Sequence, residues 1–185
     1  MKSISKAIFI SALLFCLPFS STAAEQNAQT LNSEKQTYSN PTYNLRIQFP
    51  KSWSIFSYPS KRTDLIQFSA VPPTHLPRVE ITITPKDQQG APTLRYKTRK
   101  SGAPETTIEE EGESIINSYT AKMTLAHITD HSTVDQYSLT YYIKNGTTGY
   151  LFMLQGDYKN YSEDRKVFDE IMSTMELTPE IPKQK

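Results

Sequence analysis

Two histidines stand four residues apart in the segment His127-Ile128-Thr129-Asp130-His131, the one cluster of metal-ligand residue types in the chain. On a helix, histidines at positions i and i+4 share a face, as zinc sites on helices require. Here the segment follows an alternating pattern that predicts a strand ending near Leu125. We therefore expect loop histidines, with no metal site and no cofactor, and we keep metal binding open as an alternative.

No nucleophile stands in a recognisable catalytic setting. The single cysteine, Cys16, lies in the N-terminal apolar run, no Gly-x-Ser-x-Gly elbow occurs, and the six glycines are scattered. Carboxylate pairs of the glycosidase kind have no characteristic sequence spacing, so the acidic stretch 109–113 leaves a hydrolase open. A solvated surface is the simpler interpretation of these glutamates. The sequence therefore predicts a protein that is not an enzyme and has no catalytic residues.

The N-terminus has the three parts of a secretory signal peptide. Lys2 and Lys6 give a basic start, residues 7–19 form an apolar run too short to span a bilayer, and small residues end at Ala24. Cleavage is expected after Ala24, giving a periplasmic or secreted protein with no membrane span after processing. An uncleaved anchor and a lipoprotein modified at Cys16 are the alternatives.

The charge of the processed chain excludes several partners. Loss of Lys2 and Lys6 from the 20 basic residues leaves 18 against 19 acidic ones, a formal charge of −1. A nucleic-acid backbone and an anionic lipid surface both need clustered Lys and Arg, so neither is an expected partner. The predicted organisation is a signal peptide (1–24), a flexible N-terminal lead (25–39), a single domain (40–178) and a flexible tail (179–185).

Alternating apolar residues predict a sheet. Tyr43, Leu45, Ile47 and Phe49 alternate with polar residues until Pro50, as in a half-buried strand. Further strands are expected over 53–56, 65–71, 79–83, 119–125, 137–143 and 150–154. The Asn145-Gly146 pair predicts a tight hairpin turn before the last of them, so neighbouring strands should be antiparallel.

One helix is predicted near the C-terminus, beginning at Ser162 as its cap and ending at Thr178-Pro179. Its apolar stripe is Val167, Phe168, Ile171, Met172 and Met175. The expected core between the sheet and this helix comprises Leu45, Ile47, Trp53, Ile81, Tyr141, Phe152, Phe168 and Met172.

The middle of the chain, residues 88–112, allows two interpretations. Its basic residues come first, at Arg95, Lys97, Arg99 and Lys100, and its acidic ones follow, at Glu105 and Glu109–Glu111. A hairpin would lay the positive arm beside the negative one, where opposite charges stabilise across strands. A short helix over 104–111 is the other possibility. Both interpretations place the charges on a solvated surface, with a partner-binding bipolar patch as the functional alternative.

Two stretches resemble PsbP-like domains. The first is Tyr43-Asn44-Leu45 with Phe49-Pro50-Lys51-Ser52-Trp53, and the second is Phe168-Asp169-Glu170-Ile171-Met172-Ser173-Thr174-Met175. Bacterial members of this superfamily include the periplasmic DcrB-like proteins. The resemblance implies an α+β fold, an antiparallel sheet flanked by helices. It carries over no functional residue, and related domains usually have a helix in the middle, where this chain has its basic-then-acidic stretch.

These observations together predict an exported, non-enzymatic interaction or assembly module of a periplasmic or envelope complex, with a protein partner in the cell envelope. The eleven tyrosines would suit such a surface, although half-buried sheet positions are the more common use of tyrosine. A small-ligand or metal carrier with a pocket between sheet and helix is the alternative. A hydrolase with an unrecognised carboxylate pair is the third.

Overall fold

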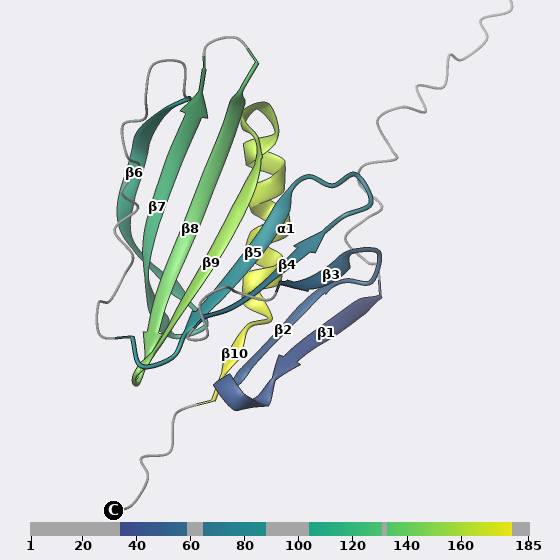
Figure 1. The fold of residues 1–185 in the computed structure, drawn as a ribbon, viewed down its shortest axis with the longest axis vertical. Coiled ribbons are helices and arrows are strands. Elements are labelled where there is room, and N and C mark those ends of the chain that lie inside the picture. Colours follow the sequence, from purple (N-terminus) through teal and green to yellow (C-terminus); the bar gives the residue numbers. More distant parts are fainter. Residues whose placement is uncertain (1–33, 59–64, 88–103, 131–132, 179–185) are drawn as a thin grey trace, which may run out of the picture. The chain divides into compact units, whose positions relative to one another are not determined.

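The computed structural model describes residues 34–58, 65–87, 104–130 and 133–178, which form two antiparallel sheets and one α-helix. The larger sheet has seven strands in the order β3-β4-β5-β9-β8-β7-β6, and the smaller has the order β1-β2-β10 (Figure 1). The strands of the larger sheet are β3 (Ser54–Tyr58), β4 (Ile66–Val71), β5 (Arg78–Thr84), β6 (Glu105–Ile116), β7 (Tyr119–Thr129), β8 (Asp135–Asn145) and β9 (Thr148–Asp157). Those of the smaller sheet are β1 (Lys35–Asn40), β2 (Leu45–Pro50) and β10 (Glu176–Leu177).

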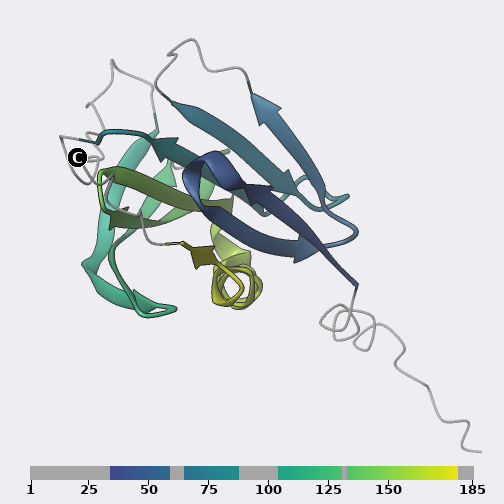
Figure 2. The ribbon, with the colours of Figure 1, turned by 90° about the horizontal axis from the view of Figure 1, so that it is seen from below.

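The helix α1 (Tyr161–Ser173) packs on one face of the larger sheet and also contacts β2. Two short 3-10 helices, η2 (Pro41–Tyr43) and η3 (Tyr158–Asn160), precede β2 and α1. Figure 2, which views the fold from below, shows α1 almost end-on beside the curved sheet. The predicted α+β class with an antiparallel sheet is therefore confirmed.

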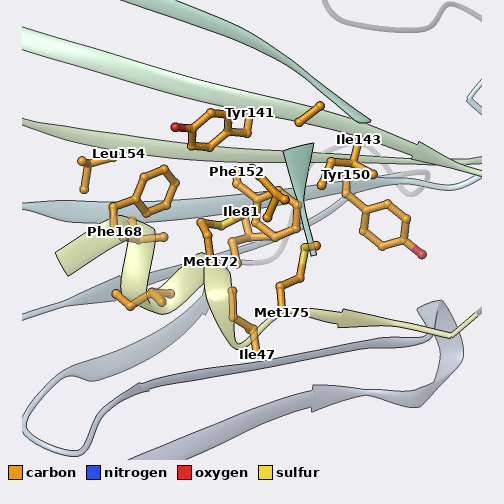
Figure 3. Close-up of a cluster of buried hydrophobic side chains, with 14 of the residues drawn as sticks. Ile47, Ile81, Tyr141, Ile143, Tyr150, Phe152, Leu154, Phe168, Met172 and Met175 are labelled. Atoms are coloured by element: carbon orange, nitrogen blue, oxygen red, sulfur yellow. The ribbon is translucent and has the colours of Figure 1, made fainter. Parts of the chain in front are cut away.

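The core lies between α1 and the sheet strands, and it contains every residue that the sequence predicts for it. All eight predicted side chains are at most 8% exposed, and Ile47, Ile81, Phe152 and Phe168 are fully buried. The Phe168 ring stacks against that of Tyr141, with ring centroids 5.6 Å apart. Figure 3 shows Ile47 of β2 on the side of α1 away from the larger sheet, and the buried cluster includes residues of both sheets, so the helix shares one core with both.

The hairpin of β6 and β7 is tied to the C-terminal end of α1. Asn117 and Ser118 form its two-residue turn, and both have positive φ angles, 46° and 72°. The Asn117 side-chain amide nitrogen lies 2.8–3.2 Å from three carbonyl oxygens, those of Met172, Ser173 and Met175. A helix leaves its last carbonyl groups without partners within the helix, so Asn117 both forms the turn and caps α1 from outside.

The helix differs from its prediction at both ends. Asn160 is its N-cap residue, makes no side-chain capping bond, and precedes Tyr161, whereas Ser162 lies inside the first turn. The helix ends at Ser173 rather than at Thr178. Residues 176–177 instead pair with β2 as β10, because the open edge of β2 offers backbone partners that a local pattern does not reveal.

One further prediction is wrong, and one of the two alternatives for the middle of the chain is excluded. Residues 35–39, assigned to a flexible lead, belong to β1, which pairs with β2 and stacks Tyr38 on Phe68 with ring centroids 3.9 Å apart. Residues 104–111 form no helix, because residues 105–111 lie in β6, whose hairpin partner is β7. The predicted signal peptide with its cleavage at Ala24, the rest of the lead up to residue 33, the basic arm within 88–103 and the tail 179–185 lie outside the described residues.

Candidate functional site

Among the described strands, β6 lies at the edge of the larger sheet (Figure 1). Most of its twelve residues are exposed. Within the described part of the chain, β7 is the only strand that pairs with it. Its five carboxylates are those of Glu105, Glu109, Glu110, Glu111 and Glu113. An edge strand presents unpaired backbone N–H and C=O groups, so β6 combines negative charge with hydrogen-bonding capacity.

A β-bulge divides β6. The register with β7 shifts between Ile108 and Glu110, which leaves Glu109 as the extra residue. From Glu110 to Ile116 the pairing is regular, ending with Ile116 opposite Tyr119 at the two-residue turn. Bulges re-aim side chains and interrupt pairing, so the regular stretch beyond the bulge is the part of β6 that resembles an ordinary open strand.

The bulged Glu109 belongs to a polar cluster with His127, Asp135 and Tyr158. The Tyr158 hydroxyl donates to Glu109 Oε1 at 2.7 Å, and this bond raises the Tyr158 pKa. The Tyr158 ring packs against the His127 ring in a tilted arrangement, with centroids 4.0 Å apart. His127 Nε2 lies 2.7 Å from Asp135 Oδ1, and Nδ1 lies 3.7 Å from Glu109 Oε1. These contacts connect the bulge to β7, β8 and η3.

The prediction of a loop at His127 is wrong, because pairing with both β6 and β8 extends β7 to Thr129. His131 lies outside the described residues, so the predicted pair cannot be placed as a whole. Among the residues that the structure describes, no group of three or more His, Cys, Asp or Glu side chains is arranged to hold a metal ion. The same ranges contain no helix with the length and apolar character needed to cross a bilayer.

A polar cavity of about 280 Å³ lies between the C-terminal part of β6 and α1, with Tyr141, Arg165 and Asp169 in its wall. The Arg165 guanidinium donates to the Tyr161 hydroxyl at 3.0 Å and lies 3.7 Å from the Asp169 carboxylate. Burial raises the Asp169 pKa, although Arg165 partly opposes the shift. The cavity falls just below the usual 300–1,000 Å³ of small-molecule sites, and its charged groups already face each other.

A second hydrogen-bonded pair lies under the first turn of α1, where the fully buried Tyr137 donates to Asp164 Oδ2 at 2.8 Å. Burial is the largest cause of the raised pKa at both groups. Gly156 makes room for the pair, because a Cβ there would lie 2.8 Å from the Tyr137 hydroxyl oxygen and 2.9 Å from Asp164 Oδ2. The pair therefore joins β8 to α1, and its perturbed pKa values have this structural cause.

Replacing Asp164 with Asn should change how stability depends on pH. Burial raises the folded-state pKa above the unfolded value of about 4, so between these two values the folded protein binds more protons than the unfolded one. The free energy of unfolding therefore falls as pH rises through this window. Asparagine stays neutral and can still accept the Tyr137 hydroxyl, so the Asp164→Asn variant should gain stability relative to the parent as pH rises.

Urea unfolding from about pH 3 to about pH 7 measures this difference. Glu170→Gln is the matched control, because Glu170 is an exposed acid on the same helix. A stability difference between parent and Asp164→Asn that stays constant across this range would contradict the prediction.

The comparisons with known proteins concern the fold. No protein-family model matches the sequence, and neither does any curated protein. The solution structure of cyanobacterial PsbP (CyanoP) from Synechocystis sp. PCC 6803 is similar, with a TM-score of 0.62 and 11% sequence identity over 79% of this chain and 94% of that one. The chain has a PsbP-like fold.

A crystal structure from Bacteroides thetaiotaomicron VPI-5482 is also similar to this chain, with a TM-score of 0.54 and 11% identity, covering 78% of this chain and 49% of that one. The resemblance drawn from the Tyr43–Trp53 and Phe168–Met175 stretches is thus confirmed at the level of the fold. The nearer likeness to DcrB-like proteins stays a prediction.

Sequence reasoning missed the edge position of β6. The available signal was Asn117-Ser118, two turn-forming residues between the apolar pairs Ile115-Ile116 and Tyr119 with Ala121. Such a pair marks a hairpin. This signal would have predicted that the glutamate-rich stretch pairs with the strand that begins at Tyr119. It would not have predicted that the stretch lies at the edge of a sheet.

Proposed function

We propose that the protein is an exported, non-enzymatic module that binds another protein in a periplasmic or envelope complex. One observation carries the proposal: the larger sheet ends in a long, exposed strand, β6, with no further strand beside it in the described residues. Open edges invite pairing with other chains, and proteins normally shorten, cover or block them. An open strand of this length is a suitable protein-binding surface.

The sequence supports the compartment. The basic start, the short apolar run and the small residues up to Ala24 are typical of a secretory signal peptide, which supports export. The fold supports the class only in a general way, since a PsbP-like scaffold specifies no chemistry by itself.

A small-ligand carrier is the second candidate, and the cavity of about 280 Å³ beside α1 favours it. This cavity lies between the sheet and the helix, where the carrier alternative from the sequence places its ligand pocket. The mutual pairing of Arg165 and Asp169 weighs against it, because a ligand would have to compete with that contact.

The test is to express the tagged full chain in its own host, crosslink intact cells and fractionate them. We expect a processed protein that begins at Glu25, is found in the periplasmic or extracellular fraction, and is crosslinked to an envelope protein. Intact mass gives the processing site. A Leu13→Arg, Leu14→Arg variant is the control, because charges in the apolar run should block export and abolish the crosslink. Retention of Met1 with a cytoplasmic location would contradict the proposal.

A further inference from the structure

We propose that the outer edge of β6 binds an extended, basic segment of the partner protein, which adds to the larger sheet beside Glu111, Glu113 and Ile115. The inference rests on the proposed function, and it names both the chemistry of the partner and the contact. It follows from three features of the regular stretch of β6 beyond its bulge: the direction of its backbone groups, its charge and its exposed apolar side chain.

The register determines which backbone groups are available. A two-residue hairpin turn is closed by a hydrogen-bonded pair, here Ile116 and Tyr119. Hydrogen-bonded and non-hydrogen-bonded pairs alternate along an antiparallel ladder, so the next residue back, Ile115, directs its N–H and C=O away from β7. The same holds for Glu113 and Glu111. These three residues form a short template for one more strand, and the bulge at Glu109 ends it.

Charge selects the incoming strand. Glu111, Glu113 and Ile115 share one face of β6, because alternate residues of a strand point the same way. On β7 the residues opposite the two glutamates are Thr124 and Lys122, so one lysine balances two carboxylates. Lysine or arginine at the matching positions of an added strand would form favourable cross-strand pairs. The same rule disfavours a second copy of β6, which would bring the glutamates of both copies into one patch.

The exposed side chain of Ile115 indicates that this edge binds a partner and is not only protected against pairing. Glutamates alone are a common means of keeping an edge strand unpaired. The Ile115 side chain, however, is 70% exposed and follows the two glutamates on their own face. An exposed isoleucine does not help glutamates to prevent pairing at an edge, whereas a bound partner strand would bury the Ile115 side chain. The favoured partner sequence therefore alternates basic residues with an apolar residue beside Ile115.

The probe is a blocked peptide of about eight residues that alternates lysine and valine, added to the processed full-length protein. Amide hydrogen exchange followed by NMR is the readout. We expect exchange at Glu111, Glu113 and Ile115 to slow about tenfold, with no change at amides that already bond to β7. A peptide N-methylated at the residues facing β6 should lose this effect, because it cannot donate to the edge.

The protein variant Glu111→Lys with Glu113→Lys should weaken binding about tenfold or more, because two attractive pairs become repulsive. Glu163→Lys makes the same kind of change on an exposed helix position and should leave binding unaltered. Equal binding of a glutamate-valine peptide, or undiminished binding by the double variant, would overturn the proposal. Concentration-dependent protection of β6 without peptide would overturn it in favour of a second copy.

The two proposals fail separately. An envelope protein that crosslinks to the parent and equally to the Glu111→Lys, Glu113→Lys variant would leave the binding module in place and overturn β6 as its contact. Absence of any crosslinked envelope protein would contradict the proposed function, whatever the peptide does.

Discussion

A chain that ends at Ser162 should lose cooperative unfolding altogether. The deletion removes nearly all of α1 together with β10, and with them Phe168, Ile171, Met172, Met175 and Leu177, which are at most 4% exposed. Full burial of such a side chain contributes about 1.5–3 kcal/mol, so the loss is on the order of 10 kcal/mol. Domains are stable by only about 5–15 kcal/mol in total. The remaining sheet would also expose its apolar face.

Thermal unfolding followed by near-ultraviolet circular dichroism tests this result. The matched control is a chain that ends at Thr178, the last residue that the structure describes, because it keeps α1 and β10 intact. It should melt as the full chain does. A cooperative transition near the parent temperature in the shorter chain would show that α1 is not part of the cooperative core.

Replacing Phe168 with Ala should cost about 3–5 kcal/mol, the range for a buried aromatic side chain whose loss leaves a cavity. The Phe168 ring is fully buried and stacks on Tyr141, so truncation removes this contact and leaves a cavity in the core. This effect approaches the whole stability of a marginal domain. The variant should therefore unfold at markedly lower urea concentration, with an unchanged dependence of free energy on urea.

Two further variants make this measurement specific. Phe168→Leu keeps much of the apolar volume and should cost less than Phe168→Ala, because the residual cavity is smaller. Lys166→Ala changes a side chain that is 66% exposed on the same helix and should alter stability by no more than about 0.5 kcal/mol. A loss below about 1 kcal/mol for Phe168→Ala would contradict the position of α1 over the core.

Much of the fold can be predicted from local patterns. The alternation of Leu45, Ile47 and Phe49 places β2, and the matching pattern from Tyr137 to Ile143 places β8. The apolar stripe of Phe168 and Met172 identifies the face of α1 that lies on the core. These predictions succeed because burial of one face dictates the spacing of apolar residues within a single segment.

The errors occur where a segment depends on a distant partner. β1 has a single partly buried aromatic ring, Tyr38, and exists through pairing with β2. β10 consists of two residues that pair with the edge of β2 opposite β1, although the helical pattern of the sequence continues up to them. His127 follows the apolar positions of β7 but is held in the strand by neighbours on both sides.

The sequence by itself determined the fold class and the identity of the core, because both depend on the spacing of nearby apolar residues, whereas export stays a prediction. Only the tertiary structure decided the features on which the proposed contact depends. Among the described strands, β6 lies at the edge of the larger sheet, Glu109 is bulged, and the register turns the backbone groups of Glu111, Glu113 and Ile115 away from β7. Strand order and register join segments that are far apart in the chain. Local periodicity therefore carries no information about which edge remains open.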